Sequence, residues 1–469
     1  MKFNLAIILP EIFLAISICL LLLVGVFRKK SYKLINFLSI LVLAITFFII
    51  FNFDNNSYVV FTNSFLRDNF SNYFKLLLII SSILVIIISQ QFIIDKNLSR
   101  FEYPIIILLS VLGMFFMISS NDLILFYLGL ELQSLALYIL AAIDRDSIKS
   151  TESGVKYFVL SALSSGLLLY GCSLLYGFIG STNFEIISES LTSENTGAIF
   201  AMVFILVGLA FKVSAVPFHM WTPDVYEGAP TPITAFFAVV PKVAGFAVLI
   251  KFMSVPFKNI LNEWQLIIIF ISIASMILGA VAAIGQTNIK RLIAYSSIGH
   301  MGYALAGIAT GTQNGYMSSI IYITIYVIMN IGTFACILAL KKDDKYFEDI
   351  KDLSGVSNKH SLLSISFLIL FFSLAGIPPL AGFFAKLYVF IAVIESKMYF
   401  LAIIGLVTTV ISAFYYIRII KIIYFDEKNI ELSRIKNLGV SSAILICCFI
   451  ISTYFMYPSI LNRFLVNIF

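Results

Sequence analysis

The stretch AFKVSAVPFHMWTPDVYEGAPTPITAFFAVVPKVAGF, residues 210–246, decides the fold of this chain. It joins two apolar segments of membrane-spanning length through a run rich in proline, and each segment contains a lysine, Lys212 and Lys242. A charge in the middle of a bilayer costs roughly 2.5–3.5 kcal/mol even on a lenient scale, so such charges usually face a protein interior or a water path. The pattern indicates a membrane protein that carries charge or protons.

The composition agrees with that interpretation. Of the 469 residues, 60% are hydrophobic and only 12% are charged. The first apolar run, from Leu5 to Val26, is too long for the core of a signal peptide and predicts a first transmembrane helix. The five cysteines lie in apolar stretches without metal-ligand spacing, which predicts packing roles. The net charge of +6 is explained by basic loops and gives little support for a nucleic-acid partner.

Apolar segments of about 20 residues separated by polar breaks predict an all-α polytopic protein with about fourteen transmembrane helices. The predicted spans are 5–26, 34–52, 72–92, 102–119, 122–142, 155–178, 198–218, 232–253, 265–285, 292–310, 316–340, 361–395, 399–420 and 441–465. An even number of spans places both termini on one side. Most of the 31 lysines and arginines fall on the loops of the other side, so we expect both termini outside.

Two of these spans contain helix-breaking residues. The seventh runs into Pro217, and the twelfth contains Pro378 and Pro379. Because five helices separate the two breaks, the broken segments have opposite orientations, which is typical of an inverted repeat with its functional groups at the broken pair. We therefore expect four parts: an N-terminal three-helix segment (1–100), a first repeat (101–253), a second repeat (254–420) and a C-terminal loop and helix (421–469).

The buried charges need more than a structural explanation. Lys386 lies in the twelfth span, and Glu131 and Lys242 each lie ten residues into a span, roughly 15 Å deep, beyond the reach of a side chain that extends to the membrane surface. Lys251 is near the end of its span and is expected to reach that surface, and Pro241 alone predicts only a kink. A structural ion pair remains an alternative, but three deep lysines to one deep carboxylate favour a functional charged axis.

The three histidines differ in their prospects. His300 lies nine residues into the tenth span and is either a proton relay or a hydrogen-bonded packing residue. His219, at the end of the broken seventh span, is a candidate for proton entry from the cytoplasmic side, or a residue of the membrane interface. His360 lies in a loop and is expected to be solvated.

A soluble catalytic constellation is missing from the sequence. It contains no Walker A sequence, no GxGxxG after a strand, no HExxH and no cysteine or histidine cluster for a metal, haem or iron–sulfur centre. We therefore expect no cofactor and no metal to be bound by this chain. An ion gradient or a partner protein must supply the energy.

Four segments together resemble the antiporter-like membrane subunits of respiratory complex I and of multisubunit cation/proton antiporters. They are NDLILFYLGLELQSLALYILAA (121–142), residues 210–246 quoted above, NIKRLIAYSSIGHMGYAL (288–305) and SLAGIPPLAGFFAKLYVF (373–390). The resemblance covers about residues 100–420. It implies that Glu131, Lys212, Lys242 and Lys386 form a proton path.

Within that family, the chain ends soon after the last predicted helix, unlike the L type, and has Lys386 where the M type typically has glutamate. The resemblance therefore favours the N type. It implies a translocase role within an NADH:quinone oxidoreductase, with NADH, FMN, iron–sulfur clusters and quinone in other subunits. It also implies M-type and K-type neighbours in the lipid bilayer of a bacterial inner membrane, or of a mitochondrial inner membrane for an organelle gene. A Mrp-type Na⁺/H⁺ antiporter subunit and a non-transporting scaffold are the alternatives.

Overall fold

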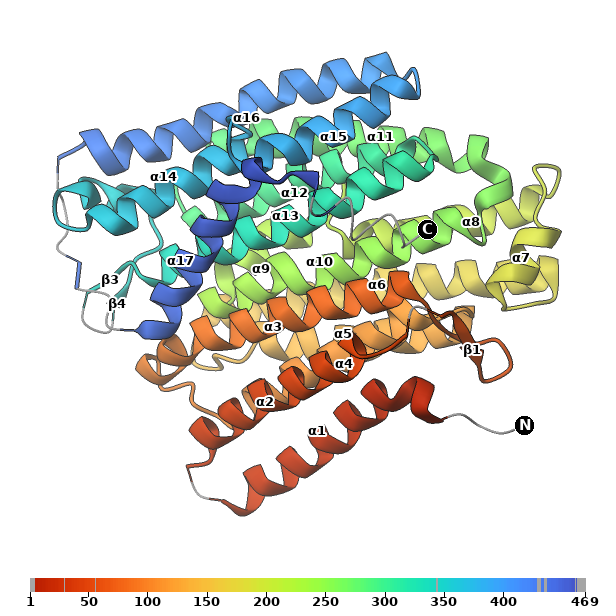
Figure 1. Ribbon diagram of the computed structural model, residues 1–469, viewed down its shortest axis with the longest axis horizontal. Coiled ribbons are helices and arrows are strands. Elements are labelled where there is room, and N and C mark those ends of the chain that lie inside the picture. The colour runs from red at the N-terminus through yellow and green to blue at the C-terminus, as the bar shows by residue number, and fades with distance from the viewer. Residues whose placement is uncertain are drawn as a thin grey trace.

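The computed structural model describes residues 5–28, 30–54, 56–342, 345–427, 432–433, 437–459 and 461. Most of these residues are helical, as the sequence predicts, and the long helices run side by side along one direction (Figure 1). The helices are α1 (Leu9–Phe27), α2 (Tyr32–Phe51), α3 (Asn69–Asp95), α4 (Glu102–Ser119), α5 (Leu123–Ala141), α6 (Ile148–Ile179), α7 (Phe184–Ser190), α8 (Thr196–Lys212), α9 (Trp221–Gly228), α10 (Thr231–Ser254), α11 (Leu261–Ile284), α12 (Ile289–Ala309), α13 (Gln313–Leu338), α14 (Ser361–Ala375), α15 (Ala381–Glu395), α16 (Tyr399–Phe425) and α17 (Leu438–Thr453).

Short elements occupy the loops between these helices. The hairpins β1 (Tyr58–Val60) with β2 (Phe65–Arg67), and β3 (Lys341–Lys342) with β4 (Lys345–Tyr346), are antiparallel. The 3-10 helices are η1 (Leu5–Ile8), η2 (Lys258–Ile260), η3 (Ile350–Leu353), η4 (Val356–Asn358) and η5 (Tyr454–Met456). The β1–β2 hairpin and α7 lie at one end of the bundle and the β3–β4 hairpin at the other (Figure 1).

Twelve helices within the described residues are long and apolar enough to cross a membrane. The two other predicted spans are those with breaks. The predicted seventh span, 198–218, ends in its break: α8 stops at Lys212, residues 213–220 are not helical, and α9 begins only after the predicted span, at Trp221. The twelfth is divided into α14 and α15 by residues 376–380. The breaks fall where the sequence predicts them, whereas the count of fourteen spans stays a prediction. The last part of the fourteenth predicted span, beyond residue 461, lies outside the described residues.

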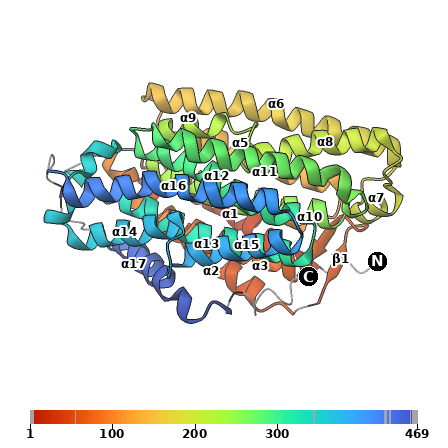
Figure 2. The same cartoon turned by 90° about the horizontal axis from the view of Figure 1, so that it is seen from above.

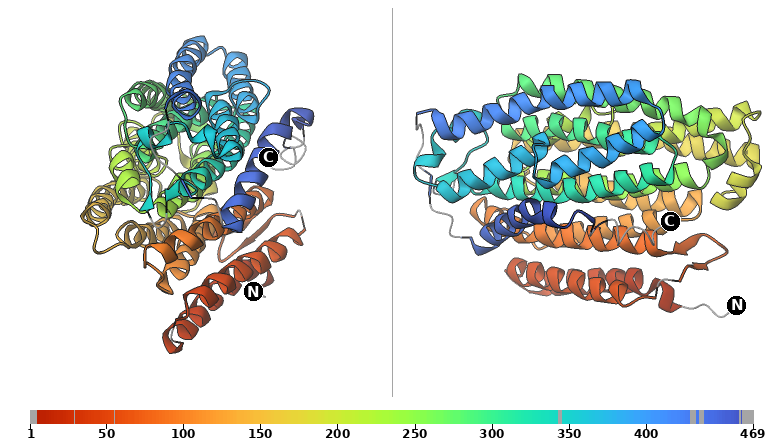
Figure 3. Two further views of the ribbon diagram at one scale, coloured as in Figure 1. Left: turned by 90° about the vertical axis from the view of Figure 1, so that its left-hand side faces the viewer. Right: turned by 45° about the horizontal axis from the view of Figure 1, so that its top comes forward.

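The core of the bundle is formed by three helices. The whole apolar window of α10 is buried, and 94% of that of α12 and of α13, whereas α1, α2, α6, α11, α16 and α17 are less than half buried. Figure 2 shows α10 and α12 between α6 on one side and α14 and α17 on the other. Seen end on, the α1–α2 hairpin forms one edge of the bundle (Figure 3). The inner helices are therefore packed against protein on all sides, and charged side chains in their buried segments do not contact lipid or bulk solvent directly.

Close backbone contacts at glycines fix two helix pairs. A Cβ atom on Gly129 of α5 would lie 2.8 Å from the carbonyl oxygen of Gly113 in α4, and one on Gly279 of α11 would lie 2.4 Å from the backbone nitrogen of Gly299 in α12. Neither pair could pack this closely with a larger residue. The pairs α4–α5 and α11–α12 are the first two helices of the two predicted repeats.

Candidate functional site

Lys212 is the last residue of α8, at the first break. Its Nζ donates hydrogen bonds to Ser134 Oγ of α5 at 2.7 Å and to Ser161 Oγ of α6 at 2.9 Å. Tyr138 donates to the same Ser161 hydroxyl at 2.6 Å. The lysine is 6% exposed, so its ammonium is held by neutral hydroxyls in the protein interior.

Glu131 lies close to this cluster along α5, three residues before Ser134 and on the same side of the helix. The structure describes both Glu131 and Lys212, and no ion pair within 4.0 Å joins them. The Oε1 atom of Glu131 is buried without a hydrogen-bond partner, while the neighbouring Leu128 and Leu135 are exposed. Lys212 therefore binds Ser134, one turn further along α5, and forms no ion pair with Glu131.

Lys242 lies in the middle of α10 and is 1% exposed. Its Nζ donates a hydrogen bond to Ser297 Oγ of α12 and lies 5.5 Å from the ring centroid of Tyr226 in α9. Pro241, directly before it, sits inside α10, which continues through the proline. Lys242 thus connects the broken-helix segment to α12.

His300 occupies the centre of a hydrogen-bonded network. Its Nδ1 shares a hydrogen bond with Tyr322 of α13 at 2.6 Å, and its Nε2 shares one with Tyr416 of α16 at 3.1 Å. Ser297, His300 and Tyr303 follow each other at intervals of three residues on α12, which places them along one side of the helix. Of the two expectations for His300, hydrogen-bonded packing is therefore present, and the relay role stays a prediction.

Lys386 of α15 lies at the second break. Its Nζ donates to the carbonyl oxygens of Ala375 at 2.9 Å and Leu374 at 3.3 Å, which belong to the last turn of α14. It also lies 4.9 Å from the ring centroid of Tyr303. The break left by Pro378 and Pro379 frees these carbonyls, and the lysine satisfies them.

The structure therefore brings Lys242 and Lys386 to opposite ends of one row on α12. Ser297 contacts the first lysine, Tyr303 contacts the second, and His300 lies between them. The spacing of three in SSIGHMGY (296–303) was the sequence signal for this row, and of its residues only His300 was singled out from the sequence. The lysine at each end of this row donates only to neutral acceptors.

His219 and Pro217 lie in the loop between α8 and α9. His219 is partly exposed, and within the described residues no hydrogen bond joins it to the charged residues of the axis. His360, at the cap of α14, shares a hydrogen bond through Nε2 with the carbonyl of Leu432 at 3.2 Å and is not simply solvated.

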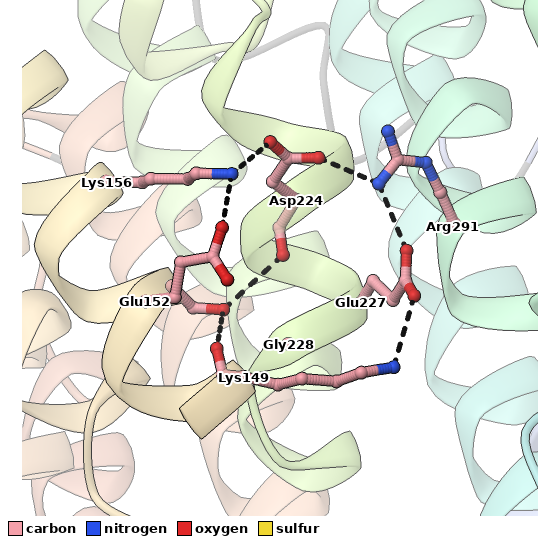
Figure 4. Close-up of a pocket in the computed structure, with 8 residues that line it drawn as sticks. Lys149, Glu152, Lys156, Asp224, Glu227, Gly228 and Arg291 are labelled. Atoms are coloured by element: carbon pink, nitrogen blue, oxygen red, sulfur yellow. Dashed lines mark hydrogen bonds and ion pairs between the residues drawn. The ribbon is translucent and has the colours of Figure 1, made fainter. Parts of the chain in front are cut away.

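An ion-pair network around α9 was not found from the sequence (Figure 4). Asp224 pairs with Lys156 of α6 at 2.9 Å and with Arg291 of α12 at 2.7 Å. Glu227 pairs with Arg291 at 3.0 Å and with Lys149 at 3.6 Å. These residues line a cavity of about 190 Å³ beside the first break. The sequence signal was the pair of acids in TPDVYEG (222–228) opposite the basic Lys290-Arg291.

The contacts of Asp224 explain why its pKa departs from the ordinary value. Burial raises the pKa of Asp224, but the hydrogen bonds from Lys156 and Arg291, together with their charges, outweigh it, so its pKa lies below the ordinary value. The carboxylate therefore stays ionised and ties α6, α9 and α12 together at neutral pH.

Buried charges are more numerous than the sequence analysis expects. Lys251 was expected to reach the surface, and this is wrong: it is 4% exposed and donates to the carbonyl of Ile118 at 3.1 Å. Glu11 is a buried carboxylate that the sequence did not single out, whereas Glu131 is only partly buried, and Glu11 pairs with Lys75 at 2.5 Å. Lys290 is also buried and pairs with Glu348 at 2.7 Å. Among the described residues, no group of three His, Cys, Asp or Glu side chains could hold a metal ion.

Comparison with known proteins assigns the architecture. Residues 120–412 match the family described as NADH:quinone oxidoreductase/Mrp antiporter, transmembrane region. The chain is 57% identical to NADH-quinone oxidoreductase subunit N of Pelagibacter ubique over 458 residues, which covers 97% of each chain. It is 48% identical to the protein of the same name from Rhodospirillum rubrum, over 96% of this chain and 94% of that one.

Solved structures agree. A chain of respiratory complex I from Thermus thermophilus superposes with a TM-score of 0.83 at 28% identity, covering 97% of this chain and 98% of that chain. A chain of the Mrp complex from Dietzia sp. superposes with a TM-score of 0.87 at 20% identity, covering 99% and 97%, which shows a shared fold.

Proposed function

Because the chain belongs to the NADH:quinone oxidoreductase/Mrp antiporter family, we propose that it translocates protons as a membrane subunit of an NADH:quinone oxidoreductase. The proposed path extends the row on α12 back to Lys212, and from here on the row includes all three lysines, Lys212, Lys242 and Lys386. The cofactors of such a complex are carried by other subunits, and its other membrane subunits are the partners of this chain. We place it in the inner membrane of a bacterium with both termini outside.

One observation carries this proposal. Lys212, Lys242 and Lys386 are all buried, yet each donates only to neutral acceptors: serine hydroxyls or backbone carbonyls. A lysine bound to a carboxylate would be held in its charged form by that carboxylate. A lysine bound to neutral oxygens can release its proton without leaving an uncompensated negative charge behind.

In this proposal the proton moves along the row in steps. A proton enters near the charged cavity at α9 and protonates Lys212, and the position of the Glu131 carboxylate sets how firmly Lys212 holds it. The proton then passes to Lys242, and through Ser297, His300 and Tyr303 to Lys386. Transfers between neighbours need movement or water, and the two breaks give the backbone places where both are tolerated.

The two-repeat organisation is part of the proposal. The close glycine pairs are α4 with α5 and α11 with α12, which are the first two helices of parts 101–253 and 254–420. Each break falls at the fourth predicted span of its part, after α8 in the first and between α14 and α15 in the second. Equivalent packing and equivalent breaks support two related halves, flanked by segments 1–100 and 421–469.

The alternatives are separated by identity. The Mrp chain shares the fold at 20% identity, whereas relatives named for NADH-quinone oxidoreductase reach 57% over nearly the whole chain. A non-transporting scaffold has no need of three buried lysines with neutral acceptors, each of which costs free energy.

The test compares electron transfer and proton pumping in membranes that carry Lys212→Ala in a background without the native gene, with assembly verified on a native gel. We expect NADH-driven pumping to fall, and NADH:quinone electron transfer to fall with it if the two are tightly coupled. Lys258→Ala, an exposed lysine outside the row, is the matched control. Wild-type pumping by an assembled Lys212→Ala complex would refute the proposal.

A further inference from the structure

A second group of buried charges lies outside the row described above, toward the end of the bundle that carries the β1–β2 hairpin. Lys251 is three residues from the end of α10, and Asp68 caps the start of α3. Glu11 of α1 and Lys75 of α3 form an ion pair at 2.5 Å, with side chains only 1% and 2% exposed. The start of α1 and the hairpin lie at this end in Figure 1. We call these four residues the outer cluster.

Lys251 links this cluster to the row. It lies nine residues after Lys242 on the same helix, about 14 Å further along at 1.5 Å per residue. The α10 helix packs against both α3 and α4 there, and Lys251 Nζ donates to the carbonyl of Ile118 at the end of α4. Lys251 therefore has the same kind of neutral acceptor as the three lysines of the row.

The charges that act on Lys251 come from α3. They are the carboxylate of Asp68 and the ammonium of Lys75. Lys75 is paired with Glu11 and also lies 5.2 Å from the ring centroid of Phe65 and 5.6 Å from that of Phe115. A carboxylate and two aromatic rings therefore surround the Lys75 ammonium.

The roles of these residues differ accordingly. Lys75 and Glu11 are partners in a buried ion pair. Lys251 is held by a neutral carbonyl and can release a proton. Asp68 is partly exposed at the start of α3, and its side chain accepts a hydrogen bond from the backbone N–H of Ser71 at 2.8 Å. Asp68 at the start of α3 and Lys251 near the end of α10 lie at the same end of two packed helices, and a partly exposed carboxylate there is the group that can pass a proton to bulk water.

We propose that Lys251 and Asp68 form an outward branch of the proton path, with the buried Glu11–Lys75 ion pair beside it. This inference rests on the proposed function. In the transfer, the ammonium of Lys251 loses a proton and becomes a neutral amine, and the carboxylate of Asp68 gains that proton. Asp68 then gives it to water outside, and Lys242 protonates Lys251 again.

A buried hydroxyl at the end of α4 supports the branch. Ser119, next to Ile118, is buried and its Oγ has no hydrogen-bond partner within the described residues, as is the case for Oε2 of Glu11. Buried polar atoms are normally satisfied. Ser119 directly follows the residue that accepts from Lys251, and a hydroxyl there that is free to donate and accept suits a site through which protons pass.

The decisive variant is Asp68→Asn. Asparagine caps a helix about as well as aspartate, so the start of α3 is preserved while the carboxylate is removed. Lys251→Met is the second variant, since methionine fills a similar volume without a charge. Lys258→Met, an exposed lysine in η2 at the same end of the bundle, is the control.

The measurement is the number of protons pumped per NADH oxidised, in inverted membrane vesicles that contain the whole complex. We expect Asp68→Asn and Lys251→Met to lower this ratio while NADH:quinone electron transfer continues, and Lys258→Met to keep it. Asp68→Asn decides the matter if Lys251→Met fails to assemble.

The branch is wrong if Asp68→Asn keeps the wild-type ratio in an assembled complex, or if Lys258→Met lowers it equally. Lys212→Ala is measured in parallel. If Lys212→Ala pumps normally, the proposed function itself fails. If Lys212→Ala abolishes pumping while the outer variants pump normally, only the outward branch fails.

Discussion

The Glu11–Lys75 pair allows a prediction whose size follows from burial. Both side chains are almost fully buried, and they are joined at 2.5 Å. Replacing Lys75 by methionine removes the cation and leaves the Glu11 carboxylate without compensation in a dry site. Breaking a buried pair in this way costs about 3–5 kcal/mol, because the remaining charge stays desolvated and no longer has an opposite charge to stabilise it.

Removing both charges has a different result. In Glu11→Met with Lys75→Met, two apolar side chains of similar length face each other. Replacing a buried pair by apolar residues is often neutral or stabilising, so we expect the double variant to recover most of the roughly 3–5 kcal/mol lost by the single one. Lys149→Met is the matched surface control: its side chain is 73% exposed, and its pair with Glu227 at 3.6 Å contributes at most about 1 kcal/mol.

The assay is unfolding of the purified complex in detergent by increasing fractions of sodium dodecyl sulfate, followed by circular dichroism and by retention of this subunit on a native gel. The double-mutant cycle gives the coupling between the two residues. If Lys75→Met costs no more than Lys149→Met, the pair is hydrated and the reasoning from burial is refuted.

Three further predictions concern other parts of the molecule. Gly129→Val should prevent assembly of the complex on a native gel, since its Cβ would lie 2.7 Å from the backbone nitrogen of Met117, whereas Gly166→Ala, with nothing within 4 Å, should assemble normally. His300→Gln should keep assembly but lose pumping, because glutamine retains hydrogen-bonding groups without a titratable ring; pumping at the wild-type rate would exclude a relay role. Because the pKa of Asp224 is lowered in the folded protein, its contribution is present above its unfolded pKa of about 3.9 and is lost as pH falls through the lower folded value. The melting temperature of Asp224→Asn should therefore fall less steeply than that of the wild type as the pH is lowered through this range. Identical curves of melting temperature against pH for the two proteins would contradict the prediction.

The sequence predicted the helices and both breaks because these depend on local properties. Apolar length defines a span, and a proline removes a backbone donor wherever it stands. Pro217 and the Pro378-Pro379 pair therefore marked residues 213–220 and 376–380 correctly. The burial of Lys212, Lys242 and Lys386 also followed, since each lies well inside an apolar run.

Contacts between distant helices could not be predicted in the same way. Glu11 and Lys75 each lie near the end of a span, where a single sequence suggests solvent, and nothing in it shows that α1 and α3 bring them together. Lys251 was misjudged for the same reason. Its distance from the end of α10 was estimated correctly, but α10 is surrounded by other helices, so the membrane surface is not within its reach.

The nature of each acceptor separates the buried lysines into two classes. Lys212, Lys242, Lys251 and Lys386 donate to hydroxyls or carbonyls, whereas Lys75 and Lys290 are paired with carboxylates. A carboxylate stabilises the charged lysine, so the paired class is suited to holding helices together. A neutral acceptor binds the ammonium without fixing its charge, so the other class is suited to exchanging protons. All four of its members lie on α8, α10 or α15, which places the exchanging lysines on the central helix and beside the two breaks, where the backbone can move.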